Sequence, residues 1–532
     1  MRVLWYYFTM KTTAETSQNW PEIVAKKDAR ITELEALVKF YEAQFRLHKH
    51  RQYGTKSEKS EYDQLSVFNE AEATTDENTL EPELREVQRH FRRSKRLVND
   101  RLPENLPIEI VEHDLDESEK KCPECGEALH VMGRSEKRRE LVIIPAQVKI
   151  REHVSKTYAC RSCEQNAIEE GDVTIIKAPL PTAVIKGSFA SPEAIAHIMY
   201  QKFVMAVPLY RQEQDWQRQG IILSRQTMSN WLIKATEDYL EPIYNALYER
   251  LLRHTVLHSD ETTLQVLHEP GKTPQSKSSM WLYRTGSDAE FPIVLYEYQP
   301  DKRALRPAEF LKNFQGYLHC DGADYYHCLP SEIVVVGCLA HARRKFDEAL
   351  KSMPAKDRAG TNVARGKQYC DQLFELEREF AKLTPTERFN KRQELSKPLL
   401  AEFFAWADNL SHMTKTPLGK AVHYSLNQRK YLENYLLDGR TEISNNRAER
   451  SIKPFVIGRK NFLFANTPRG AKASAIMFSI IETVKENGIN PFKYLVYIFK
   501  HMPKWDICND HESIELLLPH MLSDSAISRL RE

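Results

Sequence analysis

The sequence contains no run of 18 apolar residues, so it lacks the stretch that a membrane-spanning helix requires. The apolar segment from Leu4 to Met10 is too short for a signal peptide and no small-residue cleavage site follows it. We interpret it as the result of an assigned translation start that lies upstream of the true one, which could be Met10. Glycine is scarce, at 18 of 532 residues, and 41% of the residues are hydrophobic, which excludes collagen-like and low-complexity chains. We therefore expect a globular protein of about three or four domains that does not bind a membrane.

Cysteine and net charge are also low. Nine cysteines in 532 residues are too few for a disulfide scaffold, so we expect the chain to stay in the reducing cytoplasm. The 76 basic and 74 acidic residues leave a formal net charge of only +2, so no overall field attracts nucleic acid. Any binding to DNA must therefore come from local patches.

Four of the cysteines form two pairs of equal spacing, Cys122-Pro-Glu-Cys125 and Cys160-Arg-Ser-Cys163. A gap of two residues lets one tight turn present both sulfurs to the same ion, and four thiolates suit tetrahedral zinc. A β-like run from Leu141 to Tyr158 would bring the pairs together, whereas a redox site needs only one pair. We predict a zinc ribbon at residues 108–178 with one structural Zn²⁺ and no open position for chemistry.

The N-terminal region contains an apolar helical stripe and then a charged segment. The stripe spans about two heptads, which is short for a coiled coil, and comprises Ile31, Leu34, Val38, Tyr41 and Phe45. Residues 1–60 are predicted to contain an amphipathic helix, used either for self-association or for docking on its own protein. Residues 61–107 change from acidic to basic and indicate a solvated linker, although the basic half could track phosphates.

Residues 179–250 are predicted to be helical, and one segment is typical of a DNA-recognition helix. Ser224 suits the start of a helix whose inward face would carry Met228, Trp231, Leu232 and Ala235. The outward face, where the recognition helix of a helix-turn-helix meets base edges, would carry Arg225, Gln226 and Asn230. The same pattern also suits an ordinary three-helix packing unit, so both interpretations stay open.

From Thr255 the pattern changes to short β-type runs that are broken by turn residues. We expect strands at His254–Ser259, Thr262–Leu267, Met280–Arg284, Phe291–Tyr298, Gly316–Cys320 and Ile333–Cys338. Residues 341 to about 435, and a second region from about 444 to 500, are predicted to be helical.

Two of the predicted strands end alike, in Leu257-His-Ser-Asp260 and Leu318-His-Cys-Asp321. Because side chains alternate along a strand, His258 shares a face with the first Asp, and His319 with the second. We expect both His to be packing or hydrogen-bonding neighbours rather than ligands, because Mg²⁺ prefers oxygen. A third acid, Glu449, lies at the start of a predicted helix. Two strand-borne Asp and one helix-borne Glu suit a site for two Mg²⁺ ions.

Each of these acids also has a purely structural interpretation. Glu449 could form a capping box with Asn446 and satisfy an amide at the start of its own helix. Asp260 and Asp321 could be turn residues. Asp324, three residues after Asp321, competes with it for any catalytic role.

Several local strings together resemble the bacterial transposases of insertion-sequence family sixty-six. They are His258-Ser-Asp-Glu-Thr262, Cys338-Leu-Ala-His-Ala-Arg-Arg-Lys-Phe346, Asn445-Asn-Arg-Ala-Glu-Arg450, Ile457-Gly-Arg-Lys-Asn-Phe-Leu-Phe464 and Asn487-Gly-Ile-Asn-Pro491. The resemblance extends from about residue 30 to residue 500. One departure is the bulky pair Tyr325 and Tyr326, where smaller or single-aromatic turns are usual.

The resemblance implies a multidomain α+β protein with a ribonuclease-H-like α/β catalytic core. The core would comprise residues 251–340 and 436–500, with a helical insertion at 341–435 between them and a C-terminal tail at 501–532. The zinc ribbon and the helix-turn-helix-like domain would precede this core. The resemblance also assigns a catalytic triad to Asp260, Asp321 and Glu449. It implies that this triad holds two Mg²⁺ or Mn²⁺ ions.

The resemblance further implies a DNA transposase that cleaves the ends of an insertion sequence and joins their 3′-hydroxyls to target DNA. Phosphate contacts would come from Arg343, Arg344, Lys345, Arg459 and Lys460, although residues 343–345 could instead form a solvated helix face. The expected partners are bacterial DNA in the cytoplasm, further copies of the chain and small companion proteins of the same element. Two alternatives stay open: a catalytically inactive zinc-ribbon and helix-turn-helix DNA-binding protein, and a ribonuclease-H-like nuclease without strand transfer.

Overall fold

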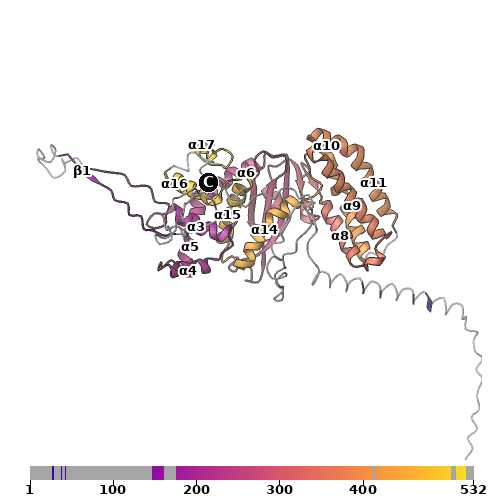
Figure 1. Ribbon diagram of the computed structural model, residues 1–532, viewed down its shortest axis with the longest axis horizontal. Coiled ribbons are helices and arrows are strands. Elements are labelled where there is room, and N and C mark those ends of the chain that lie inside the picture. The colour runs from indigo at the N-terminus through magenta and orange to yellow at the C-terminus, as the bar shows by residue number, and fades with distance from the viewer. Residues whose placement is uncertain are drawn as a thin grey trace, which may run out of the picture. The chain divides into compact units, whose positions relative to one another are not determined.

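The computed structural model describes residues 147–160, 175–410, 415–504 and 511–522, and five single helical positions between Lys27 and Glu42 (Figure 1). The chain divides into a large unit, residues 1–56 with 181–532, and a smaller unit, residues 57–180. Ile31 and Val38 of the predicted N-terminal stripe are helical and about half exposed, and the other three positions lie outside the described residues. Self-association through this helix stays a prediction. No helix in the described part of the chain is long and apolar enough to span a membrane.

In the smaller unit, β1 (Thr157–Ala159) pairs antiparallel with β2 (Ile175–Lys177). The strand is shorter than the predicted β-like run, because residues 147–156 have no regular secondary structure. Cys160 directly follows β1, and the other three predicted zinc ligands, Cys122, Cys125 and Cys163, lie outside the described residues. The convergence of the four sulfurs therefore stays a prediction.

From residue 181 the large unit forms α3 (Pro192–Phe203), α4 (Leu209–Arg218) and α5 (Arg225–Ala235), and a π-helical turn leads from α5 into α6 (Glu241–Leu251). The Thr227 N–H donates to Ser224 Oγ at 3.1 Å, so Ser224 caps α5 as predicted. Gly220 adopts a φ of +79° in the turn after α4, a conformation that favours glycine. The predicted inward face of α5 is confirmed by the burial of Met228, Trp231, Leu232 and Ala235.

A five-stranded sheet follows, in the order β5 (Val294–Gln299), β4 (Lys277–Thr285), β3 (Val256–Gln265), β6 (Gly316–His319) and β7 (Ile333–Val336). β3, β4 and β5 pair antiparallel, whereas β6 and β7 run parallel to β3. Two predicted runs form the single strand β3, because Asp260 and Glu261 pair with Leu282 and Trp281 of β4. Asp260 therefore lies inside a strand and not in a turn.

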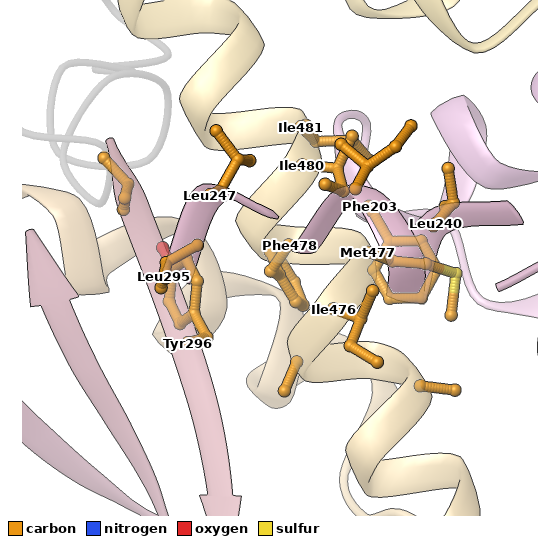
Figure 2. Packing of buried hydrophobic residues seen from close by; sticks show 14 of the residues in the cluster. Phe203, Leu240, Leu247, Leu295, Tyr296, Ile476, Met477, Phe478, Ile480 and Ile481 are labelled. Atoms are coloured by element: carbon orange, nitrogen blue, oxygen red, sulfur yellow. The ribbon is translucent and has the colours of Figure 1, made fainter. Parts of the chain in front are cut away.

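Two helices cover the sheet after residue 445: α14 (Asn446–Phe462) packs on β3 and β4, and α15 (Pro468–Glu486) packs along β5. The edge strand β5 bonds to α15, because the Tyr296 N–H donates to Ser479 Oγ at 2.7 Å. Phe478 of α15 lies between two aromatic rings, with centroids 5.1 Å from Phe203 of α3 and 5.6 Å from Tyr296 (Figure 2). The helices before the sheet and the sheet itself therefore share one hydrophobic core.

The segment between β7 and α14 is helical, as predicted, and has a hydrophobic core of its own. Its helices are α8 (Leu339–Lys351), α9 (Asn362–Glu379), α10 (Pro385–Lys391), α11 (Lys397–Asp408), α12 (Pro417–Asn427) and α13 (Arg429–Glu433). Arg392 is fully buried and donates to the Glu377 carboxylate and to the backbone oxygen of Thr441. This arginine joins the helical segment to the residues that lead into α14. At the end of the chain, α16 (Pro491–His501) packs on α3, and α17 (His511–Glu515) packs on α6.

Candidate active site

The repeated His-x-Asp pattern has a structural counterpart in the pairing of β3 with β6. These neighbouring parallel strands place His258 directly opposite His319, and the two rings stack with centroids 4.4 Å apart. Asp260 and Asp321 each follow their histidine by two residues. The register therefore brings both Asp to the same end of two adjacent strands, although β6 ends at His319 while β3 continues.

The two histidines are fully buried beneath this end of the sheet. His258 Nδ1 lies 3.0 Å from Asn445 Oδ1, and the Glu442 N–H donates to His319 Nε2 at 2.9 Å. Glu442 is thus held under the strands, and the hydrogen bond and charge of His258 keep its pKa well below the usual range despite the opposing effect of burial. The contacts of both histidines are those of hydrogen-bonding neighbours, as the sequence predicts.

The two Asp carboxyls lie in a crowded acidic environment. Burial, and then the neighbouring Glu261, raise the pKa of Asp260 to about 8, with further contributions from Asp321 and Glu449. Burial, followed by Glu261, likewise raises the pKa of Asp321 to about 6. Backbone N–H groups partly offset these effects, since Glu261 donates to Asp260 at 2.8 Å and Ala323 donates to Asp321 at 3.1 Å. The site therefore gathers carboxyl groups whose ionisation is opposed by burial and by neighbouring acids.

Glu449 reaches this acidic group from the first turn of α14. Its Oε1 lies 3.3 Å from His341 Nε2, and Arg344 donates to its Oε2 at 3.3 Å; both partners belong to α8. No capping box forms at the start of α14, where the Asn445 side chain bonds to β3 instead. The side chain of Glu449 therefore contacts α8, and the capping interpretation does not describe this helix.

Asp324, the competitor of Asp321, lies in a short 3₁₀ turn (Asp324–Tyr326) with its side chain fully exposed. The following Tyr326 is buried, and its hydroxyl lies 2.9 Å from Ser259 Oγ. The burial of Tyr326 and the partial burial of Tyr325 orient the turn so that Asp324 faces solvent. The structure therefore groups Asp321, and not Asp324, with Asp260 and Glu449.

Glu261 is a buried carboxylate of this region that sequence reasoning missed. Lys302 donates to it at 2.9 Å and Tyr326 at 3.1 Å, and Tyr325 donates to the same carboxylate. The unusual Tyr-Tyr pair in the turn after β6 was the available signal, because tyrosine hydroxyls buried in a core need a polar partner. Glu261 anchors this turn to β3 and so helps to hold Asp321 beside Asp260.

The basic residues predicted to contact DNA near the triad mostly have partners within the protein. Arg343 donates to Asp371 at 2.5 Å, the ammonium of Lys345 lies 4.7 Å from the ring centroid of Tyr424, and Arg459 donates to Thr262 at 2.9 Å. These contacts join α8 to α9 and α12, and α14 to β3. Arg344 contacts Glu449 as described above, and Lys460 is exposed at the end of α14.

The residues predicted to read DNA lie on the solvent side of α5. Arg225, Gln226 and Asn230 are all exposed. The backbone N–H of Arg225 donates to Glu213 of α4 at 3.0 Å, which fixes the crossing of α4 and α5. Gln226 and Asn230 therefore form an exposed polar face of α5, while the Arg225 guanidinium also lies 4.0 Å from the Glu213 carboxylate.

The raised pKa of Asp260 makes the stability of the metal-free protein depend on pH. Between the ordinary Asp pKa of 3.8 and a pH of about 8, Asp260 holds its proton more often in the folded state than in the unfolded state, so the contribution of this group to stability falls as the pH rises. We expect the thermal unfolding temperature of Asp260→Asn to fall less steeply than that of the wild type from about pH 5 to pH 8. The exposed Asp324→Asn should retain the wild-type slope, and equal slopes in all three proteins would contradict the prediction.

Four family models match the chain. The model described as "Transposase IS66 family" matches residues 187–473, and the "zinc-finger binding domain of transposase IS66" matches residues 119–164. The "IS66 C-terminal element" matches residues 479–520, and "Transposase C of IS166 homeodomain" matches residues 41–111. The first match contains all three acids of the site, and the second contains all four paired cysteines.

Curated relatives are found in Sinorhizobium fredii. The uncharacterized protein y4jD is 29% identical over 416 residues, which cover 75% of this chain and 78% of the relative. The uncharacterized protein y4qI is 30% identical over 369 residues, which cover 66% of each chain. The similarity to these relatives therefore extends well beyond the local strings around the acids.

Proposed function

The chain belongs to the IS66 transposase family, and we propose that it cleaves the ends of an insertion sequence and joins the released 3′-hydroxyls to target DNA. Water would attack a phosphodiester at the element end, and the 3′-hydroxyl so formed would attack a target phosphodiester. One observation carries the proposal: Asp260, Asp321 and Glu449 are 61 and 128 residues apart in sequence, yet Asp321 and Glu449 lie close enough to raise the pKa of Asp260, and Glu449 that of Asp321.

We propose a ribonuclease-H-like core for residues 251–340 and 436–500. In such a core, adjacent central strands carry two Asp and a helix laid across the sheet supplies the Glu. β3 and β6 are adjacent and parallel, and α14 packs on β3, which supports this assignment. Residues 341–435 would be its insertion, and the zinc ribbon and helix-turn-helix-like domain would precede it.

The donor set of the site fits divalent cations. Hard cations bind carboxylate oxygens, and carboxyls whose ionisation is opposed by burial and by neighbouring acids are stabilised by added positive charge. Asp260 and Asp321 show that opposition directly in their raised pKa values. We propose that Asp260, Asp321 and Glu449 hold two Mg²⁺ or Mn²⁺ ions. When bound, such ions stabilise the entering and leaving oxygens of a phosphodiester displacement.

Groups of the protein itself hold the acids in position. Asn445 bonds β3 to the start of α14: its Oδ1 lies 3.0 Å from His258 Nδ1, and its Nδ2 donates to the Ser259 oxygen at 2.8 Å. Because Asn445 directly precedes α14, these bonds set the start of the Glu449 helix relative to Asp260. Arg344 contacts Glu449 and is partly exposed, so it is positioned to contact a phosphate of bound DNA as well.

The exposed face of α5 leads to a prediction about end recognition. We expect Gln226→Ala to weaken binding to the cognate element ends more than binding to random duplex, because a bidentate side-chain contact to a base edge contributes about 1–3 kcal/mol of discrimination. Titration of labelled duplexes at one salt concentration measures both affinities. Gln275→Ala, at another exposed glutamine, in the turn between β3 and β4, serves as the matched control and should change neither affinity. An equal loss on both duplexes would assign α5 to backbone positioning or to packing.

A strand-transfer assay with pre-cleaved element ends in Mg²⁺ tests the proposed activity. Covalent joining of the ends to target DNA, in addition to cleavage of uncut ends, supports the proposal. Cleavage without joining would identify a nuclease, and end binding without either reaction would identify an inactive DNA-binding protein. Self-association and the need for companion proteins stay predictions. The same assay tests the second of them when companion proteins of the element are added.

A further inference from the structure

One group of side chains at the site mixes nitrogen, sulfur and oxygen donors. Among the described residues, Cys338, His341 and Glu449 each offer one ligand atom, and these atoms lie within 4.8 Å of one another. Cys338 is fully buried, and its sulfur accepts the Asn445 N–H at 3.2 Å. The sulfur therefore has a structural partner at the start of α14, which leaves His341 and Glu449 as the donors that can share a cation.

The geometry of His341 and Glu449 suits two ligands of one ion. His341 Nε2 and Glu449 Oε1 lie 3.3 Å apart, and Glu449 Oε1 is buried without a hydrogen-bond partner among the described residues. Two atoms about 2.1 Å from a common ion and separated by this distance subtend about 100° at the ion, an angle found in tetrahedral and octahedral sites. The two atoms are therefore spaced as joint ligands would be.

Arg344 makes the two oxygens of Glu449 unequal. It donates to Oε2 at 3.3 Å from one turn further along α8, so the other oxygen is turned toward His341. His341 is itself fixed by its place in the first turn of α8, directly after β7, because its N–H donates to the Cys338 oxygen at 3.2 Å. The position of the imidazole is thus set by the backbone of the strand-to-helix turn.

We propose that His341 is a nitrogen ligand of the cation held by Glu449, and that it makes this position bind Mn²⁺ in preference to Mg²⁺. Transition-metal ions accept imidazole nitrogen more readily than Mg²⁺, which demands oxygen. The inference rests on the proposed function, because it adds a ligand to the site formed by Asp260, Asp321 and Glu449. The ordinary alternative is that His341 only packs against Glu449.

The test is Mn²⁺ bound to the full chain with its zinc finger loaded, observed by electron spin echo envelope modulation, which reports a directly bonded imidazole nitrogen. We expect nitrogen modulation in the wild type, its loss in His341→Gln, and its retention in His423→Gln, the control at an exposed histidine of α12. Calorimetry should show Mn²⁺ binding weakened about tenfold in His341→Gln, and Mg²⁺ binding weakened no more than about threefold.

A second variant distinguishes loss of the nitrogen ligand from misfolding of the protein. His341→Asp keeps a ligand but replaces nitrogen by oxygen, so it should bind Mn²⁺ and Mg²⁺ with similar affinity and show no nitrogen modulation. Two outcomes would overturn the role of His341 and leave the proposed active site intact. In the first, nitrogen modulation persists in His341→Gln. In the second, Mn²⁺ binding depends on Asp260 but shows no nitrogen modulation in the wild type. Failure of the wild type to bind Mn²⁺, or binding unaffected by Asp260→Asn, would overturn both proposals.

Discussion

Replacing any one of the three clustered acids, as Asp260→Asn, Asp321→Asn or Glu449→Gln, is expected to abolish both cleavage and joining while leaving end binding nearly unchanged. An amide has almost the same shape as a carboxyl but carries no charge, so it cannot hold a divalent cation beside the other two acids. Losing charge stabilisation at a reacting phosphodiester is expected to slow the reaction by about 10³-fold or more. The exposed face of α5 lies on a different element and should still bind the ends.

Rates of cleavage and strand transfer, measured beside end binding, test the three variants. Asp324→Asn is the matched control, because Asp324 is only three residues from Asp321 but fully exposed, and it should react at the wild-type rate. The metal-free Asp260→Asn protein should also unfold at a higher temperature than the wild type near neutral pH, since the substitution removes a carboxyl whose ionisation is opposed by burial and then by neighbouring acids. Normal cleavage by Asp321→Asn would remove Asp321 from the reaction centre.

Replacing one paired cysteine, as Cys122→Ser or Cys160→Ser, is expected to remove the single zinc ion and to unfold the segment around residues 119–164. Structural zinc in a small domain contributes on the order of 10–16 kcal/mol of binding free energy, which is also folding free energy. A domain of this size has no comparable core to replace it. The loss should therefore be complete.

Metal analysis of the purified protein measures the zinc content, which should be about one ion per chain in the wild type and about none in either variant. Cys328→Ser provides the control, because Cys328 is an exposed cysteine outside the paired set. X-ray absorption should show four sulfur ligands at about 2.3 Å. Full zinc retention in Cys160→Ser, or a wild-type protein free of zinc, would refute the assignment of these ligands.

Local patterns in the sequence predicted a substantial part of this structure. Ser224 starts α5, as its residue type indicates. The matching runs that end in Asp260 and Asp321 lie side by side in register, so the repeated His-x-Asp pattern anticipated the pairing of β3 with β6. Such features are predictable because a cap, a turn or an alternating strand face depends on residues within one or two turns of one another.

Other predictions needed contacts that no local pattern contains. The sequence placed Asp260 at the end of a strand. In the structure Asp260 pairs with Leu282 of β4, and β3 continues beyond it. Arg343 and Arg459, predicted to contact phosphates, also bond within the protein, to Asp371 and Thr262, and their contacts with DNA stay a prediction. Glu261 did not stand out at all, because only the folded turn after β6 brings the two tyrosine hydroxyls to its carboxylate.

By itself, the sequence indicated the family, the paired cysteines, the start of α5 and the three acids proposed for the site. Only the tertiary structure decided that Glu449 faces His341 and Arg344, that Asp324 faces solvent, and that Asn445 joins β3 to the start of α14. The physical reason is the separation along the chain. Asn445 meets Ser259 across 186 residues, and Glu449 meets Arg344 across 105. Contacts at such separations form only when the whole core packs, because the entropy lost in closing long loops must be offset by many contacts together.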